Sequence, residues 1–174
     1  MSRTEVLLLG GRSGVGKTTS ALAAHELLKQ SDVHHAVIEG DYMDLAYPAP
    51  HREFPSAGFA WRNLKAVWAN YHAFGYRRLI YANTASVLFA DRIAEAIGGH
   101  PRIIPVLLCC GDSDAARRLS SRNHGATRPE DLERNREAAR GLNDGAGTGV
   151  FRLDTDALSP TQVAEELVRH TGWV

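Results

Sequence analysis

The residue types and spacing that most directly suggest chemistry lie in residues 11–18, which read GRSGVGKT. They match the pattern G-x-x-x-x-G-K-[ST] and stand between an apolar run, VLLL, and a run of helix-forming residues that begins at Ala21. Glycines let the main chain curl so that successive N–H groups point at phosphate oxygens, and the following helix adds the positive end of its dipole. A Gly-rich turn could match the pattern by chance, but a strand before it and a helix after it favour a phosphate-binding loop (P-loop) that holds a nucleoside triphosphate.

Two side chains of this loop have defined roles in such a site. Lys17 places a positive charge on the outer phosphates, and the hydroxyl of Thr18 can ligate Mg²⁺. We therefore expect Mg²⁺ to accompany the nucleotide. The nucleotide-binding residues predicted in and beside the loop are Gly11, Ser13, Gly14, Val15, Gly16, Lys17, Thr18 and Thr19.

The elements that must position this loop follow from the apolar pattern. Mostly apolar runs at residues 5–9, 35–38, 78–81, 103–108 and 150–153 are typical of strands covered on both faces. Helical patterns separate them at residues 17–29, 61–74, 85–97, 114–122, 129–142 and 160–169. This alternation predicts one α/β domain over residues 1–174, in which a five-stranded parallel sheet has helices on both faces. Together with the phosphate-binding loop, and with a small lid described below, this is the three-layer fold of P-loop NTPases.

Composition narrows the choice of partner and compartment. Twenty basic residues balance twenty acidic ones, so the net charge does not suggest nucleic acid or an anionic membrane as a partner. No signal peptide and no apolar run near 18 residues is found, and the two adjacent cysteines, Cys109 and Cys110, suit a reducing compartment. We expect a cytoplasmic protein, and the sequence leaves monomer and homodimer open.

The end of the second strand supplies the main catalytic candidate. Ligands of parallel α/β sheets bind beyond the carboxyl ends of the strands. Gly40 permits a sharp exit there, so that Asp41 projects toward the P-loop side and can accept a proton from a substrate hydroxyl or hold Mg²⁺. Alternatively, Asp41 caps a short helix that begins at Tyr42. Asp44 is a further candidate for contact with the substrate.

The stretch that follows is predicted to form the acceptor side of the site, at about residues 42–62. Three prolines and a glycine in residues 47–59 argue against a regular element, and a long loop in a compact domain is usually functional. Its aromatic residues, together with His51 and Arg52, suit an organic substrate. Trp61 and Arg62 follow on a helix, where the spacing of Trp61 with later apolar residues also fits core packing.

Two other strand ends carry candidates. Asn83 follows the third strand, where many P-loop proteins have an acidic residue that holds Mg²⁺ through water. Asp41 then holds the metal, or Thr18, phosphates and water hold it without a second side chain. Asn83 either contacts the substrate or caps the next helix. Asp154 and Thr155 follow the fifth strand, where a loop beside the P-loop can contact the nucleotide base.

A lid is predicted at about residues 118–134. Arg118 and Arg122 are four residues apart on one helix face, and an Arg-bearing loop leads from them into the next helix. Closing such a segment would bring guanidinium groups to the phosphoryl group and exclude water. The alternative is a solvated helix with ordinary Arg–Glu pairs. We take Lys17, Asp41, Arg118 and Arg122 as the catalytic candidates.

These motifs, in this order, resemble P-loop small-molecule kinases of the nucleoside-monophosphate-kinase fold over nearly the whole chain. Residues 39–41, EGD, resemble the DGD turn of adenylyl-sulfate and gluconate kinases, whose second Asp serves as base or metal contact. Residues 118–122, RLSSR, are similar to their lid motif, and residues 153–160 resemble their adenine-side loop, so the resemblance implies that Arg118, Asp154 and Thr155 also contact the nucleotide. The layout is most similar to tunicamycin-resistance-type ATP-binding proteins and more distantly to chloramphenicol phosphotransferase. The few arginines in the lid argue against a nucleoside monophosphate as acceptor.

The resemblance implies an ATP- and Mg²⁺-dependent phosphotransferase that acts on a hydroxyl of a small organic molecule, such as an antibiotic or a metabolite. Two alternatives remain open. One is an ATP-binding resistance protein that sequesters a toxic ligand without phosphorylating it. The other is a nucleotide hydrolase or switch, although no Asn-Lys-x-Asp motif for reading guanine is present.

Overall fold

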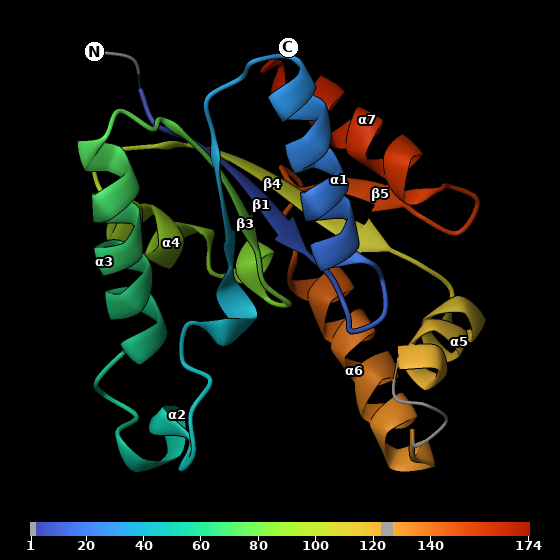
Figure 1. Cartoon of the computed structure of the whole chain (residues 1–174). Helices are drawn as coiled ribbons and strands as arrows, with labels where there is room; N and C mark the ends of the chain where they lie inside the picture. The colour runs from blue at the N-terminus through green and yellow to red at the C-terminus, as the bar shows by residue number, and fades with distance from the viewer. Residues whose placement is uncertain (1–2, 123–126) are drawn as a thin grey trace.

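A five-stranded parallel sheet forms the centre of the molecule, which is seen here in a computed structural model (Figure 1). Residues 3–122 and 127–174 are described, except for the side chain of Arg122. The strands lie in the order β2-β3-β1-β4-β5, and every neighbouring pair is parallel. The predicted sheet is therefore confirmed. The strands are β1 (Glu5–Gly10), β2 (Ala36–Glu39), β3 (Arg78–Ala82), β4 (Arg102–Cys109) and β5 (Phe151–Asp154).

Helices cover both faces of this sheet, as predicted for a three-layer fold (Figure 1). The described helices are α1 (Lys17–Gln30), α2 (Pro50–Glu53), α3 (Phe59–Ala73), α4 (Ala90–Ile97), α5 (Asp112–Arg122), α6 (Pro129–Gly145) and α7 (Pro160–Thr171), with short 3-10 turns η1 (Gly40–Tyr42) and η2 (Ser86–Leu88). None of them has an apolar stretch long enough to cross a membrane.

The side chains of β1 show how the two faces are filled. Leu7 and Leu9 point to one face, where apolar residues of α1 and α7 cover them. Val6 and Leu8 point to the other face, where α3 and α4 pack. A third cluster places Leu142 of α6 against Leu107 of β4. Because β1 is central and buried on both faces, its carboxyl end is a rigid base for the loop that follows.

Two local expectations need correction. The prolines in residues 47–59 do not preclude a regular element, because Pro50 is the first residue of the one-turn helix α2. Proline has no N–H to donate, and the first turn of a helix does not need one. The helix predicted over residues 85–97 is divided into η2 and α4, which begins at Ala90. Of the predicted lid, residues 123–126 lie outside the described part.

Candidate functional site

The loop between β1 and α1 has a conformation that requires glycine at three positions. The φ angles of Gly11, Gly14 and Gly16 are 142°, 83° and 104°. A Cβ atom on Gly11 would lie 2.8 Å from the carbonyl oxygen of Leu108, and one on Gly14 would lie 2.9 Å from that of Ala115 in α5. The backbone of the loop is therefore packed closely against β4 and α5.

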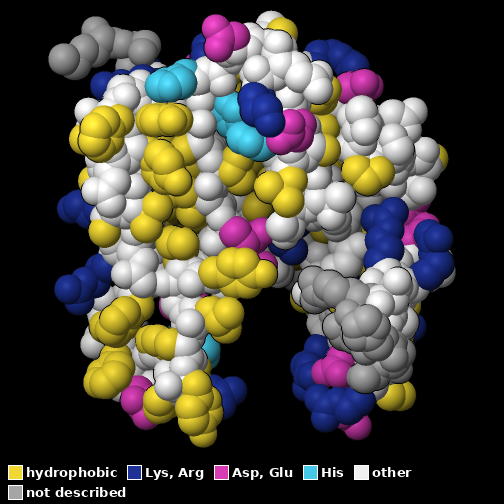
Figure 2. All heavy atoms as spheres, viewed as in Figure 1, with side chains coloured by type: hydrophobic (Ala, Val, Ile, Leu, Met, Phe, Trp, Pro, Cys, Tyr) yellow, Lys and Arg dark blue, Asp and Glu magenta, His cyan; other side chains and the backbone are white. Residues whose placement is uncertain are grey.

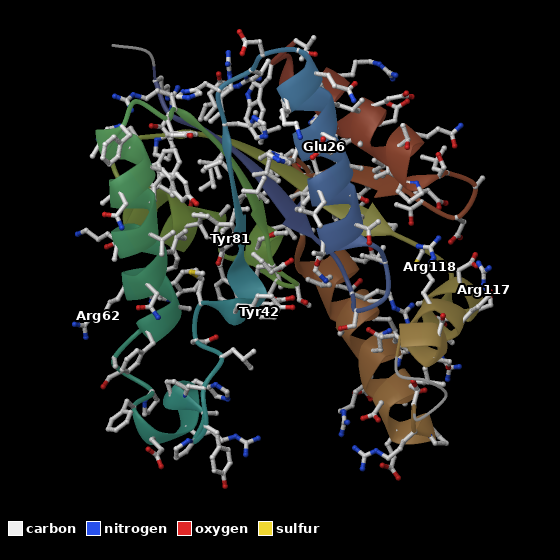
Figure 3. All side chains as sticks on the ribbon, viewed as in Figure 1. Glu26, Tyr42, Arg62, Tyr81, Arg117 and Arg118 are labelled. Carbon is white, nitrogen blue, oxygen red and sulfur yellow. The ribbon has the colours of Figure 1, made fainter. Side chains whose placement is uncertain are left out.

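This loop borders a cavity of about 480 Å³. In the space-filling view, the molecule is hollowed between one arm that carries α2 and another that carries α5 and α6 (Figures 1 and 2). Tyr42 and Arg118 approach the loop from these opposite sides (Figure 3). The residues that line the cavity are Ser13, Gly14, Gly16, Lys17, Thr18, Thr19, Asp41, Tyr42, Arg118 and Leu119.

Lys17 is the buried cation of this cavity. Only 7% of its surface is exposed, and its Nζ donates to the carbonyl oxygens of Gly11 at 2.9 Å and Arg12 at 3.4 Å. These bonds hold the ammonium group against the loop, where a bound anion would lie. Arg12 has a different role. It is 5% exposed and pairs with Asp112 of α5, and this guanidinium holds the pKa of the Asp112 carboxyl below its usual value.

Two other loop carbonyls are bound by side chains from distant parts of the chain. Nδ2 of Asn135, in α6, donates to the carbonyl oxygen of Ser13 at 3.0 Å. The carbonyl oxygen of Val15 accepts from Arg118 of α5 at 3.1 Å and from the hydroxyl of Thr155, after β5, at 3.5 Å. The loop is thus fixed from both sides. Sequence reasoning did not predict Asn135.

Glu39 is a second residue that sequence reasoning missed. The hydroxyl of Thr18 donates to its Oε2 at 2.6 Å. Its Oε1 is buried and has no hydrogen-bond partner among the described residues. A buried carboxylate oxygen without a partner, beside a hydroxyl that suits Mg²⁺, fits a divalent cation held at Thr18. Across residues 3–122 and 127–174, no three His, Cys, Asp or Glu side chains form a metal site by themselves, so phosphate oxygens or water would have to complete the coordination.

Asp41 lies at the edge of the same cavity and is held by the end of β3. Its Oδ1 accepts from Nδ2 of Asn83 at 2.7 Å and from the backbone N–H of Thr84 at 3.1 Å, while Oδ2 lies 3.4 Å from the Thr84 hydroxyl. Asp41 lies within η1, whose N-cap is Glu39, so the alternative of Asp41 as a helix cap is wrong. Asn83 donates to Asp41 and thereby orients it. Its own Oδ1 accepts from the backbone N–H of Ala85, a bond like those that helix caps make.

The turn that carries Asp41 depends on Gly40. A Cβ atom there would lie 2.4 Å from the ring of Tyr81, which is 2% exposed. Burial, followed by the nearby carboxylates of Asp41, Asp44 and Glu39, raises the pKa of the Tyr81 phenol far above its usual value. Tyr81 therefore stays neutral beneath the turn and supports it.

A second cavity, of about 270 Å³, lies beside the first and shares Gly16, Thr19 and Arg118 with it. Its remaining walls come from the phosphate-binding loop, α1, the turn after β5 and α7, and are largely apolar. They comprise Val15, Ser20, Thr155, Leu158, Pro160 and Val163. An apolar cavity that adjoins a phosphate-binding loop has the properties needed for a nucleotide base. Thr155 and Arg118, two of the predicted nucleotide contacts, line this cavity. Asp154 does not line either cavity; its carboxylate accepts from the N–H of Asp156 instead.

The predicted acceptor residues are spread over the arm that carries α2. His51 and Arg52 are exposed on α2, and Asp44 is half-buried near η1. Trp61 packs against the core and has its ring centroid 5.8 Å from that of Phe89, as the packing alternative required. Arg62 is exposed on the outer side of α3, away from the cavity (Figure 3). The side chain of Arg122 lies outside the described residues.

The same arm exposes an unusual number of large apolar side chains. Leu45, Tyr47 and Phe54 are 73%, 99% and 56% exposed, and Tyr42, which also lines the phosphate cavity, is 65% exposed. The facing arm exposes arginines instead, and most of them pair with acidic neighbours on α5 or α6. Figure 2 shows this contrast across the hollow.

Comparisons with known proteins agree with this geometry at the level of the fold. No family model and no curated protein sequence matches the chain. Among solved structures, it is similar to the tunicamycin resistance protein of Deinococcus radiodurans (TM-score 0.68, 19% identity, 98% of this chain and 96% of that one). It is also similar to a gluconokinase from Sinorhizobium meliloti (0.63, 18%, 99% and 94%) and to shikimate kinase from Acinetobacter baumannii (0.61, 13%, 95% and 92%). The chain therefore has the P-loop kinase fold in its nucleoside-monophosphate-kinase-like layout.

Proposed function

We propose that the protein transfers the terminal phosphoryl group of ATP to a hydroxyl of a small organic molecule, with Mg²⁺ as cofactor. One observation carries this proposal: Asp41, a carboxylate held by Asn83 and Thr84, lines the same cavity as the phosphate-binding loop and Lys17. Solved structures with this fold include kinases of small molecules, which agrees with the reaction class.

The residues of the cavity divide the work of phosphoryl transfer. The backbone of residues 13–19 and the ammonium group of Lys17 bind the phosphates, and the cavity lined by Thr155 and Leu158 takes the base. Thr18 and Glu39 hold Mg²⁺, which neutralises phosphate charge when bound. Catalysis of this reaction depends mainly on positioning and electrostatics, and both are supplied by rigid parts of the fold.

Asp41 has the role of general base. Its carboxylate accepts the proton of the acceptor hydroxyl while this oxygen forms its bond to the terminal phosphorus and ADP leaves. The hydrogen bonds from Asn83 and Thr84 fill Oδ1 and leave Oδ2 with only a long contact, so Oδ2 is the oxygen available to the acceptor.

The arm that carries α2 suits an acceptor with an apolar part. Large exposed apolar side chains close to a cavity commonly mark a ligand-binding surface, and here they continue from Tyr42 at the cavity to Leu45, Tyr47 and Phe54. A polar sugar acid would leave these side chains in water. We therefore place hydroxyl-bearing molecules with an apolar chain or ring first among candidate acceptors.

A product assay tests the proposal against its alternatives. The protein is incubated with ATP, Mg²⁺ and a panel of hydroxyl compounds, and products are analysed by mass spectrometry. A mass gain of one phosphoryl group on one compound, with ADP formed in equal amount, supports the kinase. ADP formed equally with and without the compounds supports a hydrolase. Tight binding of a compound without a phosphorylated product supports sequestration, which is the function suggested by a resemblance to resistance proteins.

A further inference from the structure

The carbonyl groups of Ser13 and Val15 point out of the phosphate-binding loop toward different elements. Ser13 is bound by Asn135 of α6, whereas Val15 is bound by Arg118 of α5 and Thr155 after β5. These partners lie 122, 103 and 140 residues along the chain from the carbonyls that they bind. The conformation of the loop is therefore set by distant parts of the chain as well as by its own glycines.

Because the peptide group is planar, a contact that fixes a C=O group also fixes the direction of the N–H group of the next residue. In a trans peptide, the C=O of one residue and the N–H of the next point in opposite directions. The only cis peptide among the described residues is at Tyr47–Pro48, so the peptides here are trans. Binding the Ser13 carbonyl on the side of α6 therefore aims the N–H of Gly14 to the opposite side. The Val15 carbonyl fixes the N–H of Gly16 in the same way.

Both of these N–H groups are available to a ligand. Gly14 and Gly16 line the cavity of about 480 Å³, and neither N–H has a hydrogen-bond partner within the described residues. By contrast, the N–H of Val15 is already bonded to the carbonyl oxygen of Arg12 at 3.3 Å. The N–H groups of Gly14 and Gly16 can therefore donate to phosphate oxygens, whereas that of Val15, between them, is already bonded.

The burial of Asn135 is consistent with a specific role for its bond to the Ser13 carbonyl. It is 7% exposed on a helix whose neighbouring residues, Arg134 and Arg136, are in exposed ion pairs. A buried amide without hydrogen bonds destabilises a fold, because it has lost its bonds to water without replacing them. Only the NH₂ group of Asn135 can donate to a carbonyl, so the orientation of the amide is fixed by its partner.

We propose that Asn135 is a positioning residue that aims the N–H of Gly14 at the bound phosphates, and that it thereby couples α6 to the nucleotide site. The proposal relies on nucleotide binding at the loop, which belongs to the function proposed above. It predicts that loss of the Asn135 donor weakens the binding of phosphate groups and leaves the contacts of the base cavity unchanged.

The test is an NMR titration of the full chain with ADP and Mg²⁺, comparing the wild type with Asn135→Asp. The substitution keeps the size of the side chain but replaces the NH₂ donor with an oxygen that repels the Ser13 carbonyl. We expect the Kd for ADP to rise about tenfold, since a hydrogen bond to a charged group typically contributes this much. The shift of the Gly14 amide signal on ADP binding should fall by half or more, while that of Leu158, in the base cavity, stays the same.

Two further variants make the result decisive. Asn143→Ala changes an exposed asparagine two turns along α6 and should bind ADP like the wild type. Asn135→Ala serves where Asn135→Asp does not fold, because it removes the donor without adding charge. An unchanged Kd for ADP, or a weaker Kd with an unchanged Gly14 shift, would overturn the role of Asn135. Absence of ADP binding by the wild type would instead refute the proposed function itself.

Discussion

Replacing Asp41 with asparagine separates the two roles that its position allows. The substitution keeps the shape of the side chain and retains an oxygen that can accept from Asn83 and Thr84, as Oδ1 does now at 2.7 Å and 3.1 Å. Only the outer oxygen becomes an NH₂ group, which cannot take up a proton. Asp41→Asn should therefore fold and melt like the wild type while it lacks the proposed base.

The size of the effect follows from what the base contributes. General-base catalysis typically accelerates a reaction about 10²–10⁴-fold, or about 3–5 kcal/mol of activation free energy. We expect kcat to fall by this range. The proposed phosphate ligands are the loop backbone and Lys17, whose Nζ is held by the carbonyl oxygens of Gly11 and Arg12. The substitution changes neither of these carbonyls, so the KM for ATP should change by less than about threefold.

The matched variant is Glu39→Gln, which tests the metal role at the neighbouring carboxylate. Glu39 accepts from the Thr18 hydroxyl and has a buried oxygen without a described partner, whereas Asp41 is exposed and bonded to Asn83, directly after β3. Loss of its charge should raise the Mg²⁺ concentration for half-maximal rate by about 10–100-fold, the range found for groups that support a bound metal. The rate at saturating Mg²⁺ should largely recover.

The assay is a single-turnover measurement of phosphorylated acceptor at saturating ATP, with Mg²⁺ titrated over several decades. The reasoning predicts that extra Mg²⁺ rescues Glu39→Gln and does not rescue Asp41→Asn. If Mg²⁺ instead restores the rate of Asp41→Asn, Asp41 is a metal contact and some other group takes the proton. If Glu39→Gln shows the Mg²⁺ dependence of the wild type, the unpaired oxygen of Glu39 has no part in metal binding.

Three further predictions concern the loop, the turn that carries Asp41, and the histidine pair between α1 and the start of β2. Lys17→Ala should lower turnover by at least about a hundredfold with an unchanged circular dichroism spectrum; near-normal turnover would remove its phosphate role. Gly40→Ala puts a Cβ atom 2.4 Å from Tyr81 and should lower the free energy of unfolding in urea by about 1–3 kcal/mol. Burial lowers the pKa of His35, whose ring also bonds that of His25. The neutral form of His35 therefore contributes stability above the unfolded pKa of about 6.5, and this stability is lost as pH falls through the folded pKa. His35→Gln should flatten the decline in melting temperature from pH 7 to pH 5.

The fold could be predicted from the sequence because its signals are local. Apolar runs of strand length and helical patterns alternate along the chain, and each observed strand overlaps a predicted one. The sequence does not predict the one-turn helix α2, because prolines commonly break helices, although Pro50 stands in the first turn, where a helix accepts one. A helix of four residues has no periodicity that a pattern could reveal.

On the acceptor side, the spacing of apolar residues along α3 determines which way Arg62 points. Trp61, Leu64 and Trp68 mark the buried face of α3, and all three pack in one cluster. Successive residues of a helix differ in direction by about 100°, so Arg62 has to point away from that face. Its outward position in Figure 3 could have been predicted from the same spacing that explained Trp61.

The role of Thr84 follows from the order of the strands in the sheet, which no sequence pattern reveals. Consecutive strands β1 and β2 are not neighbours, because β3 lies between them. The end of β3 consequently stands between the phosphate-binding loop and the turn with Asp41. The N–H of Gly11 donates to the carbonyl oxygen of Thr84 at 3.0 Å, and the N–H of Thr84 donates to Asp41 at 3.1 Å. One residue of β3's exit thus links the loop to the proposed base, and the distance between phosphate and base is fixed by the sheet rather than by either motif.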